Sequence, residues 1–145
     1  MGSIGGRSAL PFLGAYAMSK FALEAMADVL RLELAPWGIH VSLVEPATIG
    51  TAMWTKPQRA LEDAPPAAVE LYRERIEKFQ QLAAKRSSSA GAPASDVAKV
   101  VEHALTAAKP KSRYMVGPDA KRRARVELLP DRWRDRVLTR FLFGS

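Results

Sequence analysis

Cysteine is absent from this 145-residue chain, and histidine occurs only twice, as His40 and His103. The lack of cysteine excludes disulfide bonds, cysteine-based zinc sites and a thiol nucleophile. The scarcity of histidine argues against a histidine-built metal site, so we expect no metal. No apolar run approaches the roughly 18 residues of a membrane span, and the first ten residues hold no apolar block of a secretory signal. We therefore expect an intracellular, cytoplasmic protein.

The excess positive charge is confined to the C-terminal end. Apolar residues make up 48% of the chain and charged residues 26%, as in ordinary soluble globular proteins. The net charge is +7, yet residues 1–108 hold 11 basic and 11 acidic side chains, whereas residues 109–145 hold 11 and 4. A basic tail on a neutral body gives little support to a nucleic-acid partner, and we expect none. No aromatic residue interleaves with Lys121-Arg122-Arg123 to stack on bases.

Three regions carry apolar residues three and four positions apart, which predicts helices with one buried stripe each. The first spans Ala15 to Ala35 and is stopped by Pro36. The others span residues 67–85 and 95–108, and Ser95 is the expected N-cap of the last one. The stripe of the first helix consists of Leu23, Met26, Ala27, Leu30 and Leu34. That of the second consists of Val69, Tyr72, Ile76, Phe79 and Leu82. That of the third consists of Val97, Val100, Val101, Ala104 and Leu105.

Two short strands are expected between these helices. Residues 39–44 are β-branched and largely apolar and end at Glu45-Pro46, which is typical of a parallel strand buried on both faces. Residues 112–116 form the second strand. A helix, a tight turn and such a strand make half of a β-α-β unit, so the strands should be parallel. Because two strands leave two open edges, further strands are expected N-terminal to residue 1.

The remaining segments are predicted as loops and as a helical tail. Residues 46–66 are rich in proline, and residues 86–94 (RSSSAGAPA) indicate a flexible connector. Beyond residue 118 we expect two helical pieces divided by Pro130. The second sets an arginine-rich face against apolar residues Trp133, Val137, Leu138, Phe141 and Leu142. Such a helix can pack on the protein itself, which we favour, or make peripheral contact with an anionic membrane surface.

One pair of side chains has the spacing required for proton transfer. Tyr16 and Lys20 stand four residues apart at the start of the first predicted helix, so both project from one face. A nearby cation favours the phenolate form of a phenol, and such a pair can give a proton to a carbonyl oxygen or take one from an alcohol. Ser3, in the preceding loop, could hold the same oxygen. By itself the Tyr-x-x-x-Lys spacing is weak, because it arises by chance in roughly one chain in six of this composition.

The order of several motifs is more specific than the pair. Residues 3–7 (SIGGR), 16–25 (YAMSKFALEA) and 38–51 (GIHVSLVEPATIGT) resemble the C-terminal half of a short-chain dehydrogenase/reductase. Residues 113–121 (RYMVGPDAK) and 128–133 (LLPDRW) resemble the branch of that family that acts on steroids, retinoids and other lipophilic alcohols.

The resemblance implies an α/β fold, specifically the C-terminal half of a Rossmann-type doubly wound parallel sheet. Residues 1–118 would form this partial catalytic half, residues 119–145 the basic helical tail, and residues 52–94 the lid over the substrate. The Gly-rich turn that binds the dinucleotide pyrophosphate in this family has no counterpart here. Met1 would stand at the end of the family's fifth strand, which points either to a misassigned start site or to a real truncation.

The resemblance also implies roles for individual residues. Tyr16 would be the general acid/base, Lys20 would favour its phenolate and hydrogen-bond the nicotinamide ribose, and Ser3 would orient the substrate oxygen. The cofactor would be NAD or NADP, which the sequence does not distinguish. Its nicotinamide would lie near four residues: Pro46, Ala47, Ile49 and Thr51. Ala47 stands where the family usually has glycine, so the local turn loses some backbone freedom. Met53 and Trp54 are candidate substrate-pocket residues, although core packing or simple exposure would explain each equally well.

Three functions therefore remain open at this stage. The first is an NAD(P)-dependent oxidoreductase for a lipophilic alcohol or carbonyl compound, inactive as this chain alone. The second is a non-catalytic remnant that pairs subunits, as a homo-oligomer, through the Ala15–Ala35 helix. The third is a peripheral membrane or interaction module that uses the basic tail.

Overall fold

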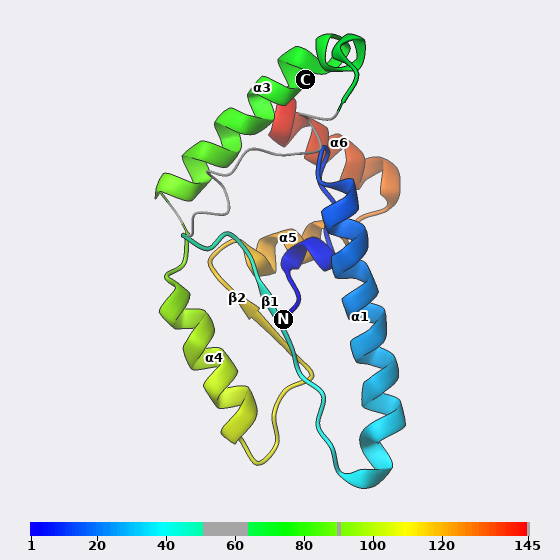
Figure 1. Cartoon of the computed structure of the whole chain (residues 1–145), viewed down its shortest axis with the longest axis vertical. Coiled ribbons are helices and arrows are strands. Elements are labelled where there is room, and N and C mark those ends of the chain that lie inside the picture. Colours follow the sequence, from blue (N-terminus) through cyan, green and yellow to red (C-terminus); the bar gives the residue numbers. More distant parts are fainter. Residues whose placement is uncertain (51–63, 90, 145) are drawn as a thin grey trace.

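A two-stranded parallel sheet lies at the centre of the computed structural model, which describes residues 1–50, 64–89 and 91–144. Strand β1 (Leu43–Pro46) pairs with β2 (Arg113–Val116), with Leu43 opposite Arg113. Helices α1 (Gly14–Leu34) and α4 (Ala94–Thr106) flank the two strands (Figure 1). The predicted α/β class and the parallel pairing are confirmed.

The apolar core lies between α4 and the sheet. Val44, Tyr114 and Val116 are buried there, and the helical stripe of Val97, Val100, Val101 and Ala104 packs against them. Leu105, which the same spacing also assigned to the stripe, is instead 80% exposed. It stands one residue beyond Ala104, about 100° further around the helix, so its side chain leaves the face that meets the strands.

Helix α1 matches its prediction within one residue at each end. The chain leaves it through the 3-10 turn η2 (Ala35–Trp37), and Gly38 follows in the left-handed conformation, with φ of 68°. Ala27 is buried and the three leucines of the predicted stripe are half-buried. Met26 is wrongly placed in that stripe, since it is 57% exposed; it lies one residue, about 100°, away from Ala27.

Both strands are shorter than predicted, but β1 is buried on both faces as expected. Leu43, Val44 and Glu45 are buried in succession. Residues 39–42 form no strand, because the partner strand begins only at Arg113, opposite Leu43. Ile39 and His40 are consequently exposed.

The predicted connector at residues 86–94 is largely wrong. Helix α3 (Pro66–Ser89) continues through its first four residues, because an arginine and three serines contain no helix breaker and the first one is Gly91. Ser95 is not the N-cap of α4. Pro93, in an extended conformation, takes that position, and its carbonyl accepts the Asp96 N–H at 3.0 Å.

The C-terminal tail forms two helices divided by Pro130, as predicted: α5 (Ala120–Val126) and α6 (Asp131–Phe143). Helix α6 packs on α3, so the tail docks on the body of the protein. Leu142 is buried near this contact and Phe79 of α3 is buried as well, whereas Trp133 and Phe141 are exposed. None of the described helices has the combination of length and apolar character needed to cross a bilayer.

Candidate active site

The N-terminal residues lie along the edge of β1 that faces away from β2. On the β2 side, Leu43 and Ala47 donate their N–H groups to Ser112 and Val116. On the other side, the Gly2 N–H donates to the Val44 carbonyl at 2.8 Å. This contact fixes the start of the chain beside the carboxyl end of β1, where Ser3 follows.

Ser3 is held by its own loop. Its Oγ accepts a hydrogen bond from the Gly5 N–H at 3.0 Å and lies 3.4 Å from the Pro46 carbonyl, to which it donates. The first bond caps the short 3-10 helix η1 (Ile4–Gly6), whose residues are all buried. The hydroxyl is therefore positioned beside the end of β1.

Two glycines allow this loop to lie directly on α1. A Cβ atom on Gly5 would stand 2.9 Å from Cε1 of Tyr16, and one on Gly6 would stand 2.7 Å from the carbonyl oxygen of Lys20. Both distances are shorter than real Cβ contacts, so any larger residue would push the loop away from the helix. The sequence separates Ser3 from Tyr16 by 13 positions, and these glycines bring the two together.

Tyr16 and Lys20 occupy the first turns of α1 on one face, as their spacing predicted. The Lys20 Nζ lies 5.7 Å from the centroid of the Tyr16 ring, within the range of a cation–π contact. Tyr16 is half-buried. The lysine thus places a positive charge beside the phenol.

Ser3 and Tyr16 share the wall of a cavity of about 850 Å³. Its volume is within the range of small-molecule and cofactor sites. From the segment after β1 the cavity is lined by Pro46, Ala47 and Ile49, and α4 forms the opposite wall. Five of the predicted site residues therefore line one cavity, and Lys20 lies beside Tyr16 without lining the cavity itself. Thr51, Met53 and Trp54 lie outside the described residues.

A bridge to Ala92 fixes the direction in which the backbone N–H and C=O groups of Ile49 point. Ala92 forms an isolated parallel bridge with Ile49: the Ala92 N–H donates to Thr48 at 3.0 Å, and the Gly50 N–H donates to Ala92 at 3.2 Å. In a parallel bridge of this pattern, the N–H and C=O of Ile49 itself point away from Ala92. They are therefore left for a group on the other side.

A buried glutamate joins the serine loop to the sheet. Glu45 of β1 is 0% exposed, and one of its oxygens lies 2.9 Å from Nε of Arg7, while the other lies 3.3 Å from Nε of Arg113. The sequence analysis did not single out either arginine. The sequence could have predicted a cationic partner for Glu45, because a glutamate in a strand buried on both faces requires a cation.

Arg113 of β2 also forms ion pairs with α1. Arg113 lies 3.1 Å from Glu24 and 2.5 Å from Asp28 of that helix. Hydrogen bonds from Arg31 and then from Arg113 lower the pKa of Asp28. Burial, followed by the neighbouring Glu24 carboxylate, raises the pKa of Glu45, and Arg7 and Arg113 oppose that rise. The site thus stands on an ion network that joins η1, α1, β1 and β2.

Comparison with known proteins places these features in context. Residues 1–62 match the family model described as short chain dehydrogenase. The chain is 35% identical over 120 residues to a 3-amino-tetrahydro-pyrrolizinone reductase of Xenorhabdus hominickii, covering 80% of this chain and 42% of that protein. It is 37% identical over 128 residues to an NADPH-dependent 3-dehydrocapnine reductase of Ornithobacterium rhinotracheale, covering 88% and 44%. With human 17-beta-hydroxysteroid dehydrogenase type 6 it shares 32% identity over 146 residues, covering 95% and 46%. The chain therefore spans less than half the length of these relatives.

Proposed function

Since this chain belongs to the short-chain dehydrogenase/reductase family, we propose that it carries the proton-transfer half of an alcohol/carbonyl oxidoreductase site. The observation that carries the proposal is that Ser3 and Tyr16, from separate segments, line one cavity with Lys20 beside the phenol. This arrangement can offer a proton donor and a second hydroxyl to one substrate oxygen.

Each side chain has a distinct part in the proton transfer. In the direction of reduction, the Tyr16 hydroxyl donates its proton to the carbonyl oxygen, and in oxidation the phenolate takes the proton from the alcohol. Ser3 turns its hydroxyl from the Pro46 carbonyl to the same oxygen. That exchange costs little, because the contact it gives up is long, at 3.4 Å. The Lys20 cation stabilises the negative charge on the phenol oxygen.

The cavity residues fit the nicotinamide end of NAD or NADP. The Ile49 N–H and C=O point away from Ala92, so they offer one donor and one acceptor, which is what a carboxamide requires. Pro46 and Ala47 would lie against the ring, Thr51 would assist at the carboxamide, and Lys20 would hydrogen-bond the ribose. When bound, the nicotinamide supplies or accepts the hydride. The name of the capnine-type relative states NADPH for that protein, and for this chain both cofactors remain open.

The substrate we propose is a small lipophilic alcohol or carbonyl compound. Support comes from the resemblance of residues 113–133 to the steroid and retinoid branch and from the 17-beta-hydroxysteroid dehydrogenase among the relatives. Met53 and Trp54 remain candidates for its pocket.

The test is the Tyr16→Phe variant, measured in a protein in which a dinucleotide-binding segment precedes this chain. We expect kcat for NAD(P)H-dependent carbonyl reduction to fall by about 10²-fold or more, because the general acid is lost, while cofactor affinity stays close to that of the parent protein. Tyr72→Phe, the same change on the exposed part of α3, is the control and should leave kcat unaltered. Equal turnover in the two variants would show that Tyr16 is not the acid/base.

A further inference from the structure

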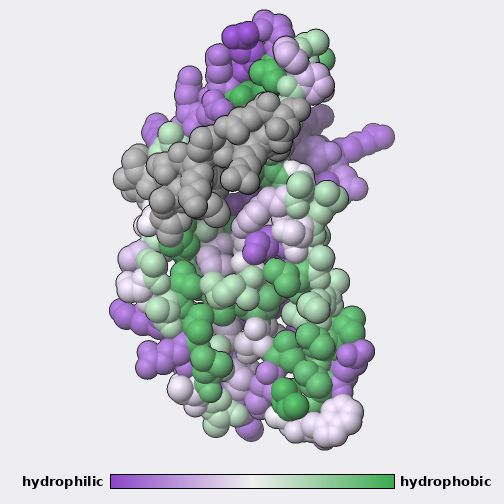
Figure 2. Space-filling model, viewed as in Figure 1, coloured by the Kyte–Doolittle hydropathy of each residue, from purple (hydrophilic) through white to green (hydrophobic). Residues whose placement is uncertain are grey.

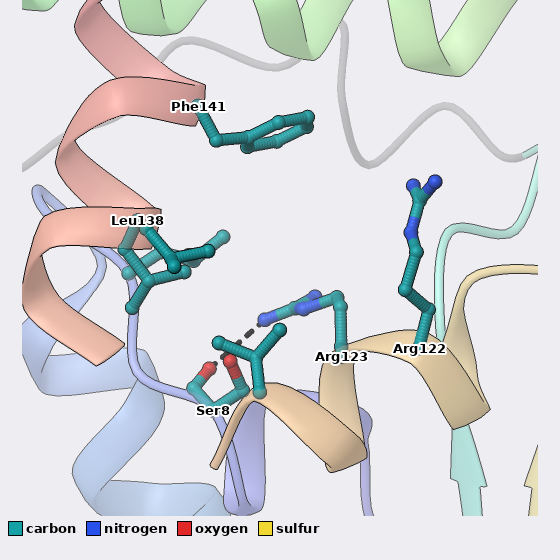
Figure 3. A pocket seen from close by; sticks show the side chains of 8 residues that line it. Ser8, Arg122, Arg123, Leu138 and Phe141 are labelled. Carbon is teal, nitrogen blue, oxygen red and sulfur yellow. Dashed lines mark hydrogen bonds between the residues drawn. The ribbon is translucent and has the colours of Figure 1, made fainter. Parts of the chain in front are cut away.

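A side chain of the C-terminal tail holds the end of the serine loop (residues 3–8). Arg123 of α5 donates from Nη2 to the carbonyl oxygen of Ser8 at 2.9 Å, across 115 positions of the sequence. Figure 3 shows Arg123 directed at Ser8, whereas its neighbour Arg122 extends away from both. Ser8 is 1% exposed, so its carbonyl is shielded from water and requires a donor from the protein. Arg123 supplies that donor.

Hydrogen bonds inside the loop connect this contact to Ser3. The Ser8 N–H donates to the Ile4 carbonyl at 3.0 Å. The Gly6 N–H donates to the Ser3 carbonyl at 2.9 Å, and the Gly5 N–H donates to the Ser3 Oγ at 3.0 Å. The serine loop is therefore one hydrogen-bonded coil. A shift of Ser8 at its end is passed on to the hydroxyl of Ser3 at its start.

Helix α5 supports this contact firmly, because it follows directly from the sheet that carries the cavity. Ala47, which lines the cavity of the proposed active site, donates its N–H to Val116 of β2 at 2.8 Å. Shortly after β2, α5 begins at Ala120, which is 0% exposed. The helix also packs on η1 of the serine loop. The base of the Arg123 side chain is thus fixed relative to the cavity wall.

We propose that Arg123 is a positioning residue of the candidate active site: by holding Ser8, it keeps the Ser3 hydroxyl at the cavity wall. The inference rests on the proton-transfer function proposed above. Arg123 is not among the described residues that line the cavity, so it acts through the serine loop and not on the substrate. Without this donor, the loop would shift until the Ser8 carbonyl met water. A reacting group misplaced by about 1 Å can cost about 10²-fold in rate.

The first measurement follows the serine loop itself, in the 145-residue chain. In Arg123→Gln we expect the NMR amide signals of Ser3 and Gly5 to shift. The Gly5 amide proton should exchange with solvent about tenfold faster, because its bond to the Ser3 Oγ opens more often. Arg122→Gln is the matched control, since Arg122 pairs with Asp119 of the preceding turn at 2.8 Å. It should leave both signals and the exchange rate unaltered.

The second measurement is kinetic and uses the protein in which a dinucleotide-binding segment precedes this chain. We expect Arg123→Gln to lower kcat for carbonyl reduction about tenfold and to leave KM within about twofold, because the loop orients a group that acts in the transition state. Arg123→Lys keeps a donor for the Ser8 carbonyl and should restore most of the lost kcat. In a Ser3→Ala background the hydroxyl is already absent, so Arg123→Gln should lower kcat by less than about twofold.

The two measurements distinguish a failure of this inference from a failure of the proposed function. If Tyr16→Phe lowers kcat and Arg123→Gln does not, Arg123 does not position Ser3. The same conclusion follows if Arg123→Gln costs as much in the Ser3→Ala background as in the parent protein. Equal Gly5 exchange in Arg123→Gln and Arg122→Gln would also overturn the assignment, whatever the kinetics. Faster Gly5 exchange with full turnover in Tyr16→Phe would instead overturn the proposed function and leave the positioning of Ser3 standing.

Discussion

At the scale of single residues, some contacts in the candidate active site can be predicted from the sequence and others cannot. The spacing of Tyr16 and Lys20 predicts a shared helix face because helical geometry is local. The closeness of Ser3 to Tyr16 is not local. It depends on how tightly the loop lies on α1, and that is determined by missing Cβ atoms at Gly5 and Gly6. Spacing alone cannot predict such a contact.

Gly6→Ala tests this close approach. The added Cβ would stand 2.7 Å from the Lys20 carbonyl oxygen, a backbone atom that cannot rotate away. We expect the free energy of unfolding, measured by urea denaturation, to fall by about 1–3 kcal/mol. Gly14→Ala is the matched control, since among the described residues no atom beyond its own helix backbone and chain neighbours lies within 4 Å of its Cβ position at the first residue of α1. It should leave stability unchanged or raise it slightly. If both variants unfold at the same urea concentration, the loop does not depend on Gly6.

At the scale of elements, periodicity predicted which segments are helices or strands better than where they end. The α1 and α4 stripes follow from their own sequences, and α4 buries its stripe against β1 and β2. The ends depend on partners instead. Residues 39–42 include the β-branched Ile39 and Val41, yet they form no strand because β2 offers no partner before Arg113. Ser95 is a good capping residue, yet Pro93 begins the helix.

The ion network around Glu45 joins these elements, and its energy should depend on pH. Arg7 and Arg113 lie beside Glu45, while Glu24 lies close enough to disfavour a second negative charge. Burial raises the pKa of Glu45 above its ordinary value of 4.5. A carboxyl with a raised pKa binds its proton more tightly in the folded protein. Its contribution to stability is therefore complete below pH 4.5 and is lost as pH rises through the folded pKa.

Glu45→Gln should reveal this dependence. We expect the stability of the parent chain, relative to the variant, to decrease as the pH of urea denaturation rises from about 4 to 7. A constant offset is also expected, because the variant replaces a carboxyl group by an amide at a fully buried position. Glu74→Gln is the control: its pKa is lowered by Lys78 on an exposed helix face, so any slope should have the opposite sign. If the stability of the parent chain relative to Glu45→Gln instead increases with pH, then Arg7 and Arg113 lower the pKa of Glu45 by more than burial raises it.

At the scale of the whole molecule, the described residues leave apolar surfaces exposed on α1 and α4. Figure 2 shows apolar side chains gathered in the lower half of one face, over α4 and the lower part of α1. The sequence predicts further strands beside these two, and this stays a prediction; on the second edge of β1 the Gly2 N–H donates to the Val44 carbonyl. Composition could not predict which helix faces stay uncovered, because that depends on what each helix meets in space.

Because apolar residues of α1 are exposed to solvent, we predict that the chain self-associates through this helix. Met18, Phe21, Val29 and Leu32 are exposed along α1, and Leu32 is the most exposed of them. Burial of one leucine contributes about 1.5–3 kcal/mol, and a symmetric dimer buries it twice. We therefore expect sedimentation equilibrium to show a dimer whose dissociation constant rises at least tenfold in Leu32→Glu. Glu33→Gln, at the neighbouring exposed position, should leave the constant unaltered. A chain that stays monomeric at every concentration, with or without Leu32, would mean that α1 does not pair subunits, and its apolar face would then need another partner.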